Sequence, residues 1–504
     1  IPAETKLKGI YEGVFYGCSA LSDIELPNGI VEISDFAFYG CSSLKKLPFE
    51  KDSGILGIYD YAFAECGLSA IEIPESVIEI GEYAFAGNKM QTLTVPSENA
   101  RTLMIGLGAF SGCNELSEIS VPFIGASFDD PRYTWFGYIF GAGDYTANAT
   151  YVPESLKHVV ITGNLRSARK GAFYDCRTLE SIELPEEIDT VYGYAFMNCP
   201  ASYTFKKAIT IRDSYRDQIV SYLSNNCFGT TGGTYCGVSG DLVLADSIIS
   251  IGRDALGGRA PNLKSLHIPR SVTTIEAGGN PSFVDIYYDG TLEEWLNITV
   301  NKWPDDEHMF EQYNLYLKGE LLTDALLPVG KYNNTLQGCV SLQSVEAEEG
   351  VTEIPAYMFY NCPNLEKITL PDTVCSIGKL ALSETKLDTF RVPLGVTEFT
   401  EAFTYSDYKN FNKLIIHSNL ESYNIGDIQN LYVDTIYDLF HVQSWSSNTP
   451  IIGNIYISGE LLTDLVLPND ISSIPDNFLR AYLPLVSVTV TAKDTGCGQW
   501  SIRD

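Results

Sequence analysis

Short apolar runs recur along the chain at intervals of 22 to 26 residues, in the same order each time. Each copy begins as L-x-x-I-x-I/L-P, continues with a Val or Ile and an I-G pair, and closes on A-F-x-x-C. Clear copies begin at Leu21, Leu68, Leu179 and Leu365. A period of this length indicates a solenoid, in which each copy forms one coil and only the stack of coils buries a continuous core.

The coil that begins at Leu68 shows what the first half of the repeat predicts. Ile71 and Ile73 alternate with Glu72, which predicts a short strand with two apolar side chains inward and the carboxylate outward. Pro74 is expected to end that strand, because proline cannot donate a hydrogen bond to a ladder.

The second half of the repeat predicts the opposite wall of the coil. Gly81 is expected to let the chain turn, and Ala84 and Phe85 to fold a short helical turn with the ring at the centre. The cysteine that closes the motif is expected to be a buried free thiol that packs as a small apolar group. Eight cysteines share this position: Cys18, Cys41, Cys66, Cys113, Cys176, Cys199, Cys339 and Cys362.

This repeat resembles the BspA-like leucine-rich repeat family, whose members occur on gut and oral bacteria and on some parasitic protists. In the commoner leucine-rich repeat the strand runs into an Asn-bearing segment, whereas here a proline follows the strand and A-F-x-x-C supplies the opposite wall. The resemblance implies a β-rich α/β repeat fold: a right-handed solenoid with short strands, tight turns, short helical turns and irregular insertions. It also implies binding to host extracellular matrix or to other bacteria.

We predict one continuous solenoid over residues 1–504. Clear coils are expected at 7–124, 155–200, 242–275 and 342–401, and insertions at 129–150 and 206–240, the second with a helix-like stretch at 219–223. A longer block is duplicated at about 284–328 and 429–468, because YLKGELLTDALLP recurs as YISGELLTDLVLP. The chain opens inside a repeat, so we expect its natural start, with any secretion signal or anchor, to lie outside this sequence.

The charge balance narrows the range of partners. The chain has 33 basic and 64 acidic residues, a net charge of −31, which argues against binding nucleic acid or an anionic membrane surface. It fits a soluble protein, or one that meets cations or basic partners. No apolar run approaches the ~18 residues of a membrane-spanning helix, so no span is expected.

Signals for catalysis, metals and cofactors are absent from the sequence. It has no C-x-x-C half-site for zinc, no phosphate-binding loop, no G-x-S-x-G elbow and no H-E-x-x-H. We therefore expect neither a cofactor nor an enzyme. Cys227 and Cys236 depart from the repeat and flank a Gly/Thr-rich loop, so a disulfide between them is a hypothesis that suits an oxidising compartment.

Two surfaces are candidates for binding a partner. Stacked strands align their outward residues in columns, and the acidic members of one column are Glu25, Glu72 and Glu183. The first insertion carries a cluster of aromatic residues, Tyr133, Trp135, Phe136 and Tyr138. The alternative interpretations are a solvated sheet face for the first and rings that patch the core for the second.

These patterns favour a non-enzymatic binding or adhesion protein, secreted or displayed on a cell surface, that presents its repeats to protein or matrix ligands. Two alternatives stay open: a carbohydrate-binding component of a surface glycan system, and a structural stalk that displays another domain.

Overall fold

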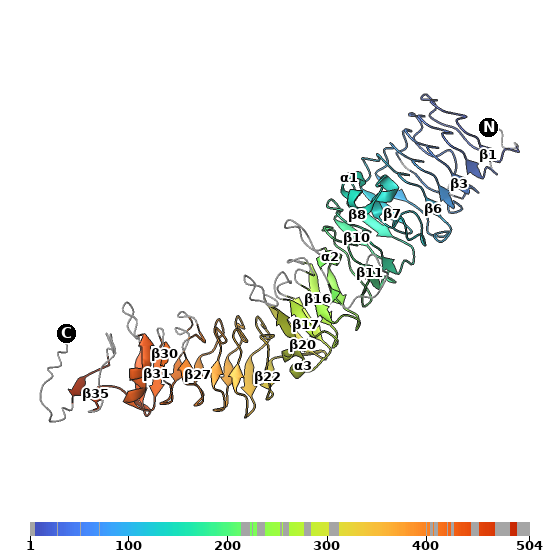
Figure 1. Cartoon of the computed structure of the whole chain (residues 1–504). Coiled ribbons are helices and arrows are strands. Elements are labelled where there is room, and N and C mark those ends of the chain that lie inside the picture. The colour runs from blue at the N-terminus through green and yellow to red at the C-terminus, as the bar shows by residue number, and fades with distance from the viewer. Residues whose placement is uncertain are drawn as a thin grey trace. The chain divides into compact units, whose positions relative to one another are not determined.

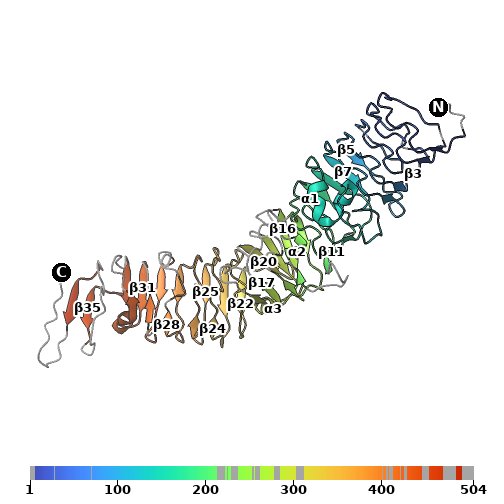
Figure 2. The ribbon, with the colours of Figure 1, turned by 45° about the horizontal axis from the view of Figure 1, so that its top comes forward.

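Stacked parallel strands form both units into which the chain divides, residues 1–290 with 299–311 and residues 291–298 with 312–504. Figure 1 and Figure 2 show short strands lying side by side from coil to coil within each unit. The computed structural model describes residues 6–27, 29–50, 52–69, 71–212, 222–223, 225–228, 237–252, 255, 262–276, 284–301, 312–399, 401–403, 407, 412–420, 422–424, 428–444, 453–468 and 484–490.

Two rows of strands pass through the first coils of the first unit. One sheet joins β1 (Gly9–Ile10), β2 (Glu32–Ile33), β3 (Gly57–Ile58), β4 (Glu79–Ile80) and β6 (Met104–Ile105). The other joins β5 (Thr92–Thr94), β7 (Glu118–Val121), β8 (His158–Ile161) and β10 (Ser181–Glu183). All the pairs within these two sheets are parallel, as successive coils of a solenoid require.

The later coils of this unit repeat the arrangement. One sheet joins β9 (Ser167–Ala168), β11 (Thr190–Tyr192) and β12 (Thr210–Arg212). Another joins β13 (Tyr222–Leu223), β15 (Ser250–Ile251), β17 (Thr274–Glu276) and β19 (Thr299–Asn301). A third contains β14 (Gly240–Val243), β16 (Leu263–Ile268) and β18 (Val284–Tyr288), and α2 is Asn225–Phe228. The helix expected at 219–223 is therefore wrong at 222–223, and the rest of that stretch lies outside the described residues.

The second unit begins at α3 (Leu292–Leu296) and the hairpin of β20 (Tyr313–Leu317) and β21 (Glu320–Leu321). Its next sheets are β22 (Asp324–Leu327), β23 (Ser344–Ala347) and β25 (Lys367–Thr369), and β24 (Glu353–Ile354) with β26 (Ser376–Ile377). Then come β27 (Thr389–Arg391), β29 (Lys413–Ile415), β31 (Asn430–Val433), β33 (Asn454–Ile457) and β34 (Glu460–Leu461). The opposite row holds β28 (Glu398–Phe399), β30 (Ser422–Asn424) and β32 (Val442–Ser444), followed by the pair β35 (Asp464–Leu467) and β36 (Ser487–Val490).

The two copies of the duplicated sequence block fold alike. In each, a short helix, α3 or η4 (Ile436–His441), precedes a β-hairpin whose two turn residues have positive φ. Lys318 and Gly319 have φ of 51° and 86°, and Ser458 and Gly459 have φ of 51° and 87°. These turns match the right-handed twist of the strands they join. That the two units form one continuous solenoid stays a prediction.

A file of phenylalanine rings runs through the first coils, as the repeat predicts. The ring centroids of Phe38 and Phe63 are 5.0 Å apart and those of Phe63 and Phe85 are 5.7 Å apart. All three side chains are fully buried. The backbone holds the file together, because the Phe38 N–H donates to the Ala62 carbonyl and the Phe63 N–H to the Ala84 carbonyl, each at 2.8 Å.

The A-F-x-x-C segments are runs of turns and not the short helical turns that the sequence predicts. In many of these segments two residues adopt a left-handed backbone, such as Tyr61 and Glu65, each with φ of 55°. This alternation aims N–H groups at the next coil, as in the donation from Glu65 N–H to the Ala86 carbonyl at 2.7 Å. A helix would use those N–H groups for hydrogen bonds within its own coil. Here they form hydrogen bonds to the neighbouring coil, so the segment forms turns and no helix.

The repeated cysteines also join neighbouring coils. The thiol of Cys66 donates to the carbonyl of Phe38 at 3.0 Å, and that of Cys113 to the carbonyl of Phe85 at 3.4 Å. Burial raises the pKa of both thiols to about 12. The expectation that all eight are buried is wrong for Cys18, which is exposed.

Thiol labelling tests this arrangement. We expect iodoacetamide at pH 8 to modify the exposed Cys18 and Cys375 of the folded protein, because thiolate is the reactive form and both sulfurs reach solvent. Cys66 and Cys113 should stay unmodified until the protein is unfolded, when all should react. Peptide mass spectrometry that finds Cys66 labelled as fast as Cys18 would contradict the stacking described here.

The glycine of the I-G pair has a different role from the predicted one. Gly81 does not have a positive φ, but a Cβ placed on it would lie 2.5 Å from the backbone nitrogen of Asp60. Gly81 is therefore needed because adjacent coils approach closely and not because the chain turns there.

Replacing Gly81 by alanine should lower the free energy of unfolding by about 1–3 kcal/mol, since backbone atoms must shift to admit the methyl group. Gly54 is the matched control, because a Cβ there would meet no described atom within 4 Å. Urea unfolding of both variants provides the comparison. Equal stability of Gly81→Ala and Gly54→Ala would show that the coils are not packed this closely.

Candidate functional site

The acidic sheet column is less continuous than the sequence predicts. Glu72 pairs with Thr94, and the column then runs through Ser120 and Val160 before it reaches Glu183. Glu25 is exposed but belongs to no described strand. The three carboxylates are therefore not brought together, because Thr94, Ser120 and Val160 stand between Glu72 and Glu183 in the column.

The first insertion supplies a rung of the stack. It forms η1 (Phe136–Phe140), η2 (Tyr145–Ala147) and α1 (Asn148–Tyr151). The N–H of Phe110 donates to the carbonyl of Ile139 at 2.9 Å, and the N–H of Phe136 donates to the carbonyl of Ala172 at 2.8 Å. η1 therefore lies between two coils and takes the place of one A-F-x-x-C segment.

This position corrects two of the candidate ligand contacts. Phe136 is 0% exposed and packs against Phe173 with centroids 5.3 Å apart. Trp135 is 9% exposed, and its indole N–H donates to the Ala142 carbonyl at 2.8 Å. Both rings patch the core, because the insertion must fill the space that the missing Ala-Phe pair would occupy, so neither is exposed enough to serve as a ligand contact.

Tyr133 and Tyr138 do reach the solvent. Their rings stack with centroids 4.9 Å apart, and Tyr133 is 36% exposed. The guanidinium of Arg132 lies 5.4 Å from the Tyr133 ring centroid and bonds to the Asp130 carboxylate, with Nη2 2.7 Å from Oδ2. This hydrogen bond with Arg132 lowers the pKa of Asp130, and the two opposite charges compensate one another.

A row of half-buried rings leads from the first coils to this pair. The rings of Phe36 and Tyr61 stack at 5.0 Å, and those of Tyr61 and Tyr83 at 5.1 Å. Tyr83 lies over Gly108, where a Cβ would be 2.5 Å from the ring, and the Gly108 N–H donates to the Tyr138 carbonyl at 2.9 Å. We call the row Phe36, Tyr61, Tyr83, Tyr138 and Tyr133 the aromatic ridge.

Backbone conformation explains why these rings face outward. Phe36, Tyr61 and Tyr83 each have φ of 55°, whereas the Ala and Phe that follow them are buried. Such a conformation is costly for an aromatic residue, and the surrounding hydrogen bonds between coils have to maintain it. The sequence signal for the ridge is an acidic residue, an aromatic residue, Ala and Phe in succession, which occurs in three coils, from Asp35, Asp60 and Glu82.

A second row, of carboxylates, lies beside the rings. Oδ1 of Asp35 accepts from the N–H of Asp60 at 3.0 Å, and Oδ1 of Asp60 accepts from the N–H of Glu82 at 2.7 Å. The pKa of the Tyr61 phenol is raised, first by burial and then by Tyr83, Glu82 and Asp60. The ridge therefore lies in a locally negative potential.

The pKa of Tyr138 extends this picture to the insertion. It is raised first by burial, and then by Tyr133 and by the carboxylates of Glu82 and Asp130. Glu82 belongs to the turn that carries Tyr83. The turn of Tyr83 and the insertion lie on either side of the coil of Gly108, because the Tyr83 N–H donates to the Leu107 carbonyl at 3.1 Å and the Gly108 N–H donates to the Tyr138 carbonyl.

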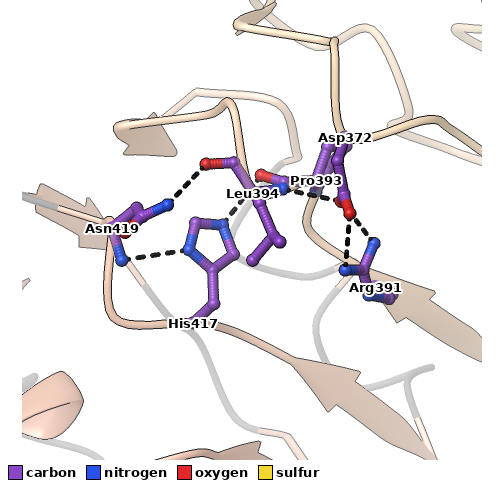
Figure 3. A network of polar contacts seen from close by, with 6 residues as sticks. All are labelled: Asp372, Arg391, Pro393, Leu394, His417 and Asn419. Carbon is purple, nitrogen blue, oxygen red and sulfur yellow. Dashed lines mark hydrogen bonds and ion pairs between the residues drawn. The ribbon is translucent and has the colours of Figure 1, made fainter. Parts of the chain in front are cut away.

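The polar network of the second unit, shown in Figure 3, ties coils together. His417 is 4% exposed; its Nε2 donates to the Pro393 carbonyl at 2.8 Å and its Nδ1 accepts from the Asn419 N–H at 3.1 Å. Nη1 and Nη2 of Arg391 donate to the Asp372 carboxylate at 2.7 and 3.3 Å, and these hydrogen bonds lower the pKa of that carboxyl. Because both ring nitrogens of His417 form hydrogen bonds with backbone groups, we assign the network a structural role.

Among the described residues no group of three or more metal-ligating side chains comes together. No described helix is long and apolar enough to cross a membrane. The proposed disulfide is not tested, because Cys227 is buried in α2 while Cys236 lies outside the described residues.

Stacked parallel strands, a buried phenylalanine file and short turns define a solenoid of the leucine-rich-repeat class. Six copies of the BspA type leucine-rich repeat region match residues 8–130, 146–279 and 332–449, more than half of the chain. The chain belongs to this family, which confirms the resemblance that the repeats indicate.

Among solved structures, the chain is similar to a leucine-rich repeat protein from Bacteroides ovatus, with 18% identity over 86% of this chain and 85% of that one and a TM-score of 0.24. It is similar to the pneumococcal vaccine antigen PcpA, with 13% identity, 94% and 91% coverage and a TM-score of 0.27. It is also similar to a leucine-rich cell surface protein from Faecalibacterium prausnitzii, with 21% identity, 59% and 89% coverage and a TM-score of 0.21. None of the curated proteins matches the sequence.

Proposed function

We propose that this chain is a non-enzymatic binding protein, secreted or displayed on a cell surface, and that it contacts a protein partner through the aromatic ridge. The observation that carries the proposal is the row of half-buried rings that crosses successive coils, with centroids 5.0 and 5.1 Å apart along Phe36, Tyr61 and Tyr83. Tyrosines that combine an apolar ring with a polar tip are favoured at the centres of protein interfaces.

The ring geometry favours a protein over a glycan at this surface. A sugar stacks on the face of an aromatic ring, but the planes of Phe36 and Tyr61 differ by 2° and those of Tyr61 and Tyr83 by 16°, so these rings cover one another's faces. Within the row, the groups left open to a partner are the ring edges and the tyrosine hydroxyl groups. These suit the polar and apolar mixture of a polypeptide surface.

The test uses purified extracellular-matrix proteins, immobilised as a panel, and the whole chain in solution. The ridge variant carries Tyr61→Asn and Tyr83→Asn, because asparagine adopts the left-handed backbone readily and should preserve the fold. The control variant carries Glu72→Gln and Glu183→Gln on the sheet column. We expect a panel protein to bind the wild type and the control alike and the ridge variant at least tenfold more weakly.

Two results would contradict the proposal: binding that the ridge variant retains in full, or no binding to any member of the panel. Circular dichroism of both variants checks that the fold is kept. Surface display is tested separately, by protease treatment of intact cells that make the full-length protein. Release of peptides from residues 6–212 by protease is the expected result, and protection of the chain until the cells are lysed would contradict it.

A further inference from the structure

The charged residues of the ridge limit the class of partner that it can bind. The turn segments that carry its first three rings, residues 34–41, 59–66 and 81–88, contain four acidic residues and no Lys or Arg. The acidic residues are Asp35, Asp60, Glu65 and Glu82. A partner that covers these rings must therefore desolvate carboxylates that have no cation within the same segments.

The carboxylates are held in place and keep acceptor capacity. Asp35 and Asp60 each use Oδ1 to accept an N–H from the next coil, which fixes the position of the group. A carboxylate has about four lone-pair sites, so each can accept further hydrogen bonds through Oδ2. Hydrogen bonds from Lys or Arg to such groups are short and strong compared with those between neutral groups.

The rings add an apolar complement to these charges. Lys and Arg carry long methylene stems that pack on apolar surface while the charged end remains with its partner. Phe36, Tyr61 and Tyr83 each directly follow one of the acidic residues in the sequence. Their rings stack face to face, so their edges are the apolar surface against which those stems would pack. Acyl chains, acidic polymers or neutral sugars lack this combination of groups.

We propose that the ridge binds a polypeptide segment rich in Lys and Arg, with its charged ends on Asp35, Asp60 and Glu82 and its side-chain stems against the rings. The inference rests on the proposed function and specifies the partner of the same site. The net charge of −31 over the whole chain would assist the approach of such a segment over longer distances.

The test measures binding of fluorescent oligolysine and oligoarginine peptides to the whole chain by anisotropy, with oligoglutamate and spermine as comparisons. The ridge variant carries Asp35→Asn, Asp60→Asn and Glu82→Gln, which keep the shape of each side chain and, at Asp35 and Asp60, an acceptor for the backbone N–H. The control carries Glu72→Gln, Glu118→Gln and Glu183→Gln on the exposed sheet face, which removes the same charge.

We expect the basic peptides to bind at least tenfold more weakly to the ridge variant and less than threefold more weakly to the control. Equal weakening in both variants would overturn the inference, because it would show an attraction to net charge alone. So would spermine binding as tight as that of the peptides, or no binding of either peptide to the wild type.

The outcome can be separated from that of the proposed function. If the Tyr61→Asn, Tyr83→Asn variant loses a matrix partner while no basic peptide binds the wild type, only the inference about basic segments fails. If that variant keeps its matrix partner, the proposed function fails, and with it the site assigned to the basic segment.

Discussion

Replacing Phe63 by alanine is expected to lower the free energy of unfolding by about 3–5 kcal/mol. The ring is 0% exposed and stacks between Phe38 and Phe85, at 5.0 and 5.7 Å, with the edge of Phe49 at 6.0 Å. Its removal leaves a cavity shared by three coils, and the rigid hydrogen bonds between coils prevent their collapse into it. Urea unfolding followed by circular dichroism measures the change.

Leu56→Ala is the control for Phe63→Ala, because Leu56 is 45% exposed and its truncation removes little buried surface. We expect the control to remain within about 0.5 kcal/mol of the wild type. If Phe63→Ala were equally mild, the ring could not be part of a continuous core.

Replacing Asn88 by alanine should lower the free energy of unfolding by about 3 kcal/mol, because several buried backbone groups lose their hydrogen-bond partners at once. Asn88 stands where other coils have cysteine, and it is 2% exposed. Its Nδ2 donates to the carbonyls of Phe63 and Phe85 at 2.8 and 2.9 Å, and its Oδ1 accepts from the Leu68 N–H at 3.1 Å. Thermal and urea unfolding both report the loss.

Asn88→Cys provides the informative comparison. A thiol here would donate to the Phe63 carbonyl, as Cys66 donates to that of Phe38, but would leave the Leu68 N–H without its acceptor. We therefore expect a stability between those of the wild type and Asn88→Ala. If Asn88→Cys is no more stable than Asn88→Ala, then Asn88 does not have the same structural role as the cysteines at this position in other coils.

Much of the coil could be predicted from the sequence, because each coil buries the same positions. The inward Ile71 and Ile73, the outward Glu72 and the file of Phe38, Phe63 and Phe85 follow from a period that the stack itself imposes. The role of Gly81 did not follow, since only the distance to Asp60 in the preceding coil distinguishes a close approach from a turn.

The first insertion could not be predicted in the same way. Its aromatic residues interrupt the period, and nothing local in the sequence separates Phe136, which fills a rung of the core, from Tyr133, which faces solvent. Hydrogen bonds to coils on either side, from Phe110 and to Ala172, make that distinction. Such contacts are long-range in sequence and have no signature within the insertion.

The aromatic ridge has a signal in the sequence, but the signal does not by itself predict that the rings stack. The rings before the Ala-Phe pair recur in phase at Phe36, Tyr61 and Tyr83, yet a helical turn would not have aligned them. Their left-handed backbone turns each ring outward onto its neighbour, so the ridge becomes visible only when the turn geometry is known.

The central claim is that these coils stack in phase, and a crystal structure of the whole chain tests it most directly. The account predicts ring centroids close to 5.0 Å apart for Phe38 and Phe63 and close to 5.7 Å for Phe63 and Phe85, with Tyr61 and Tyr83 stacked on the solvent side. Phenylalanines found in separate cores, or tyrosines pointing inward, would contradict it.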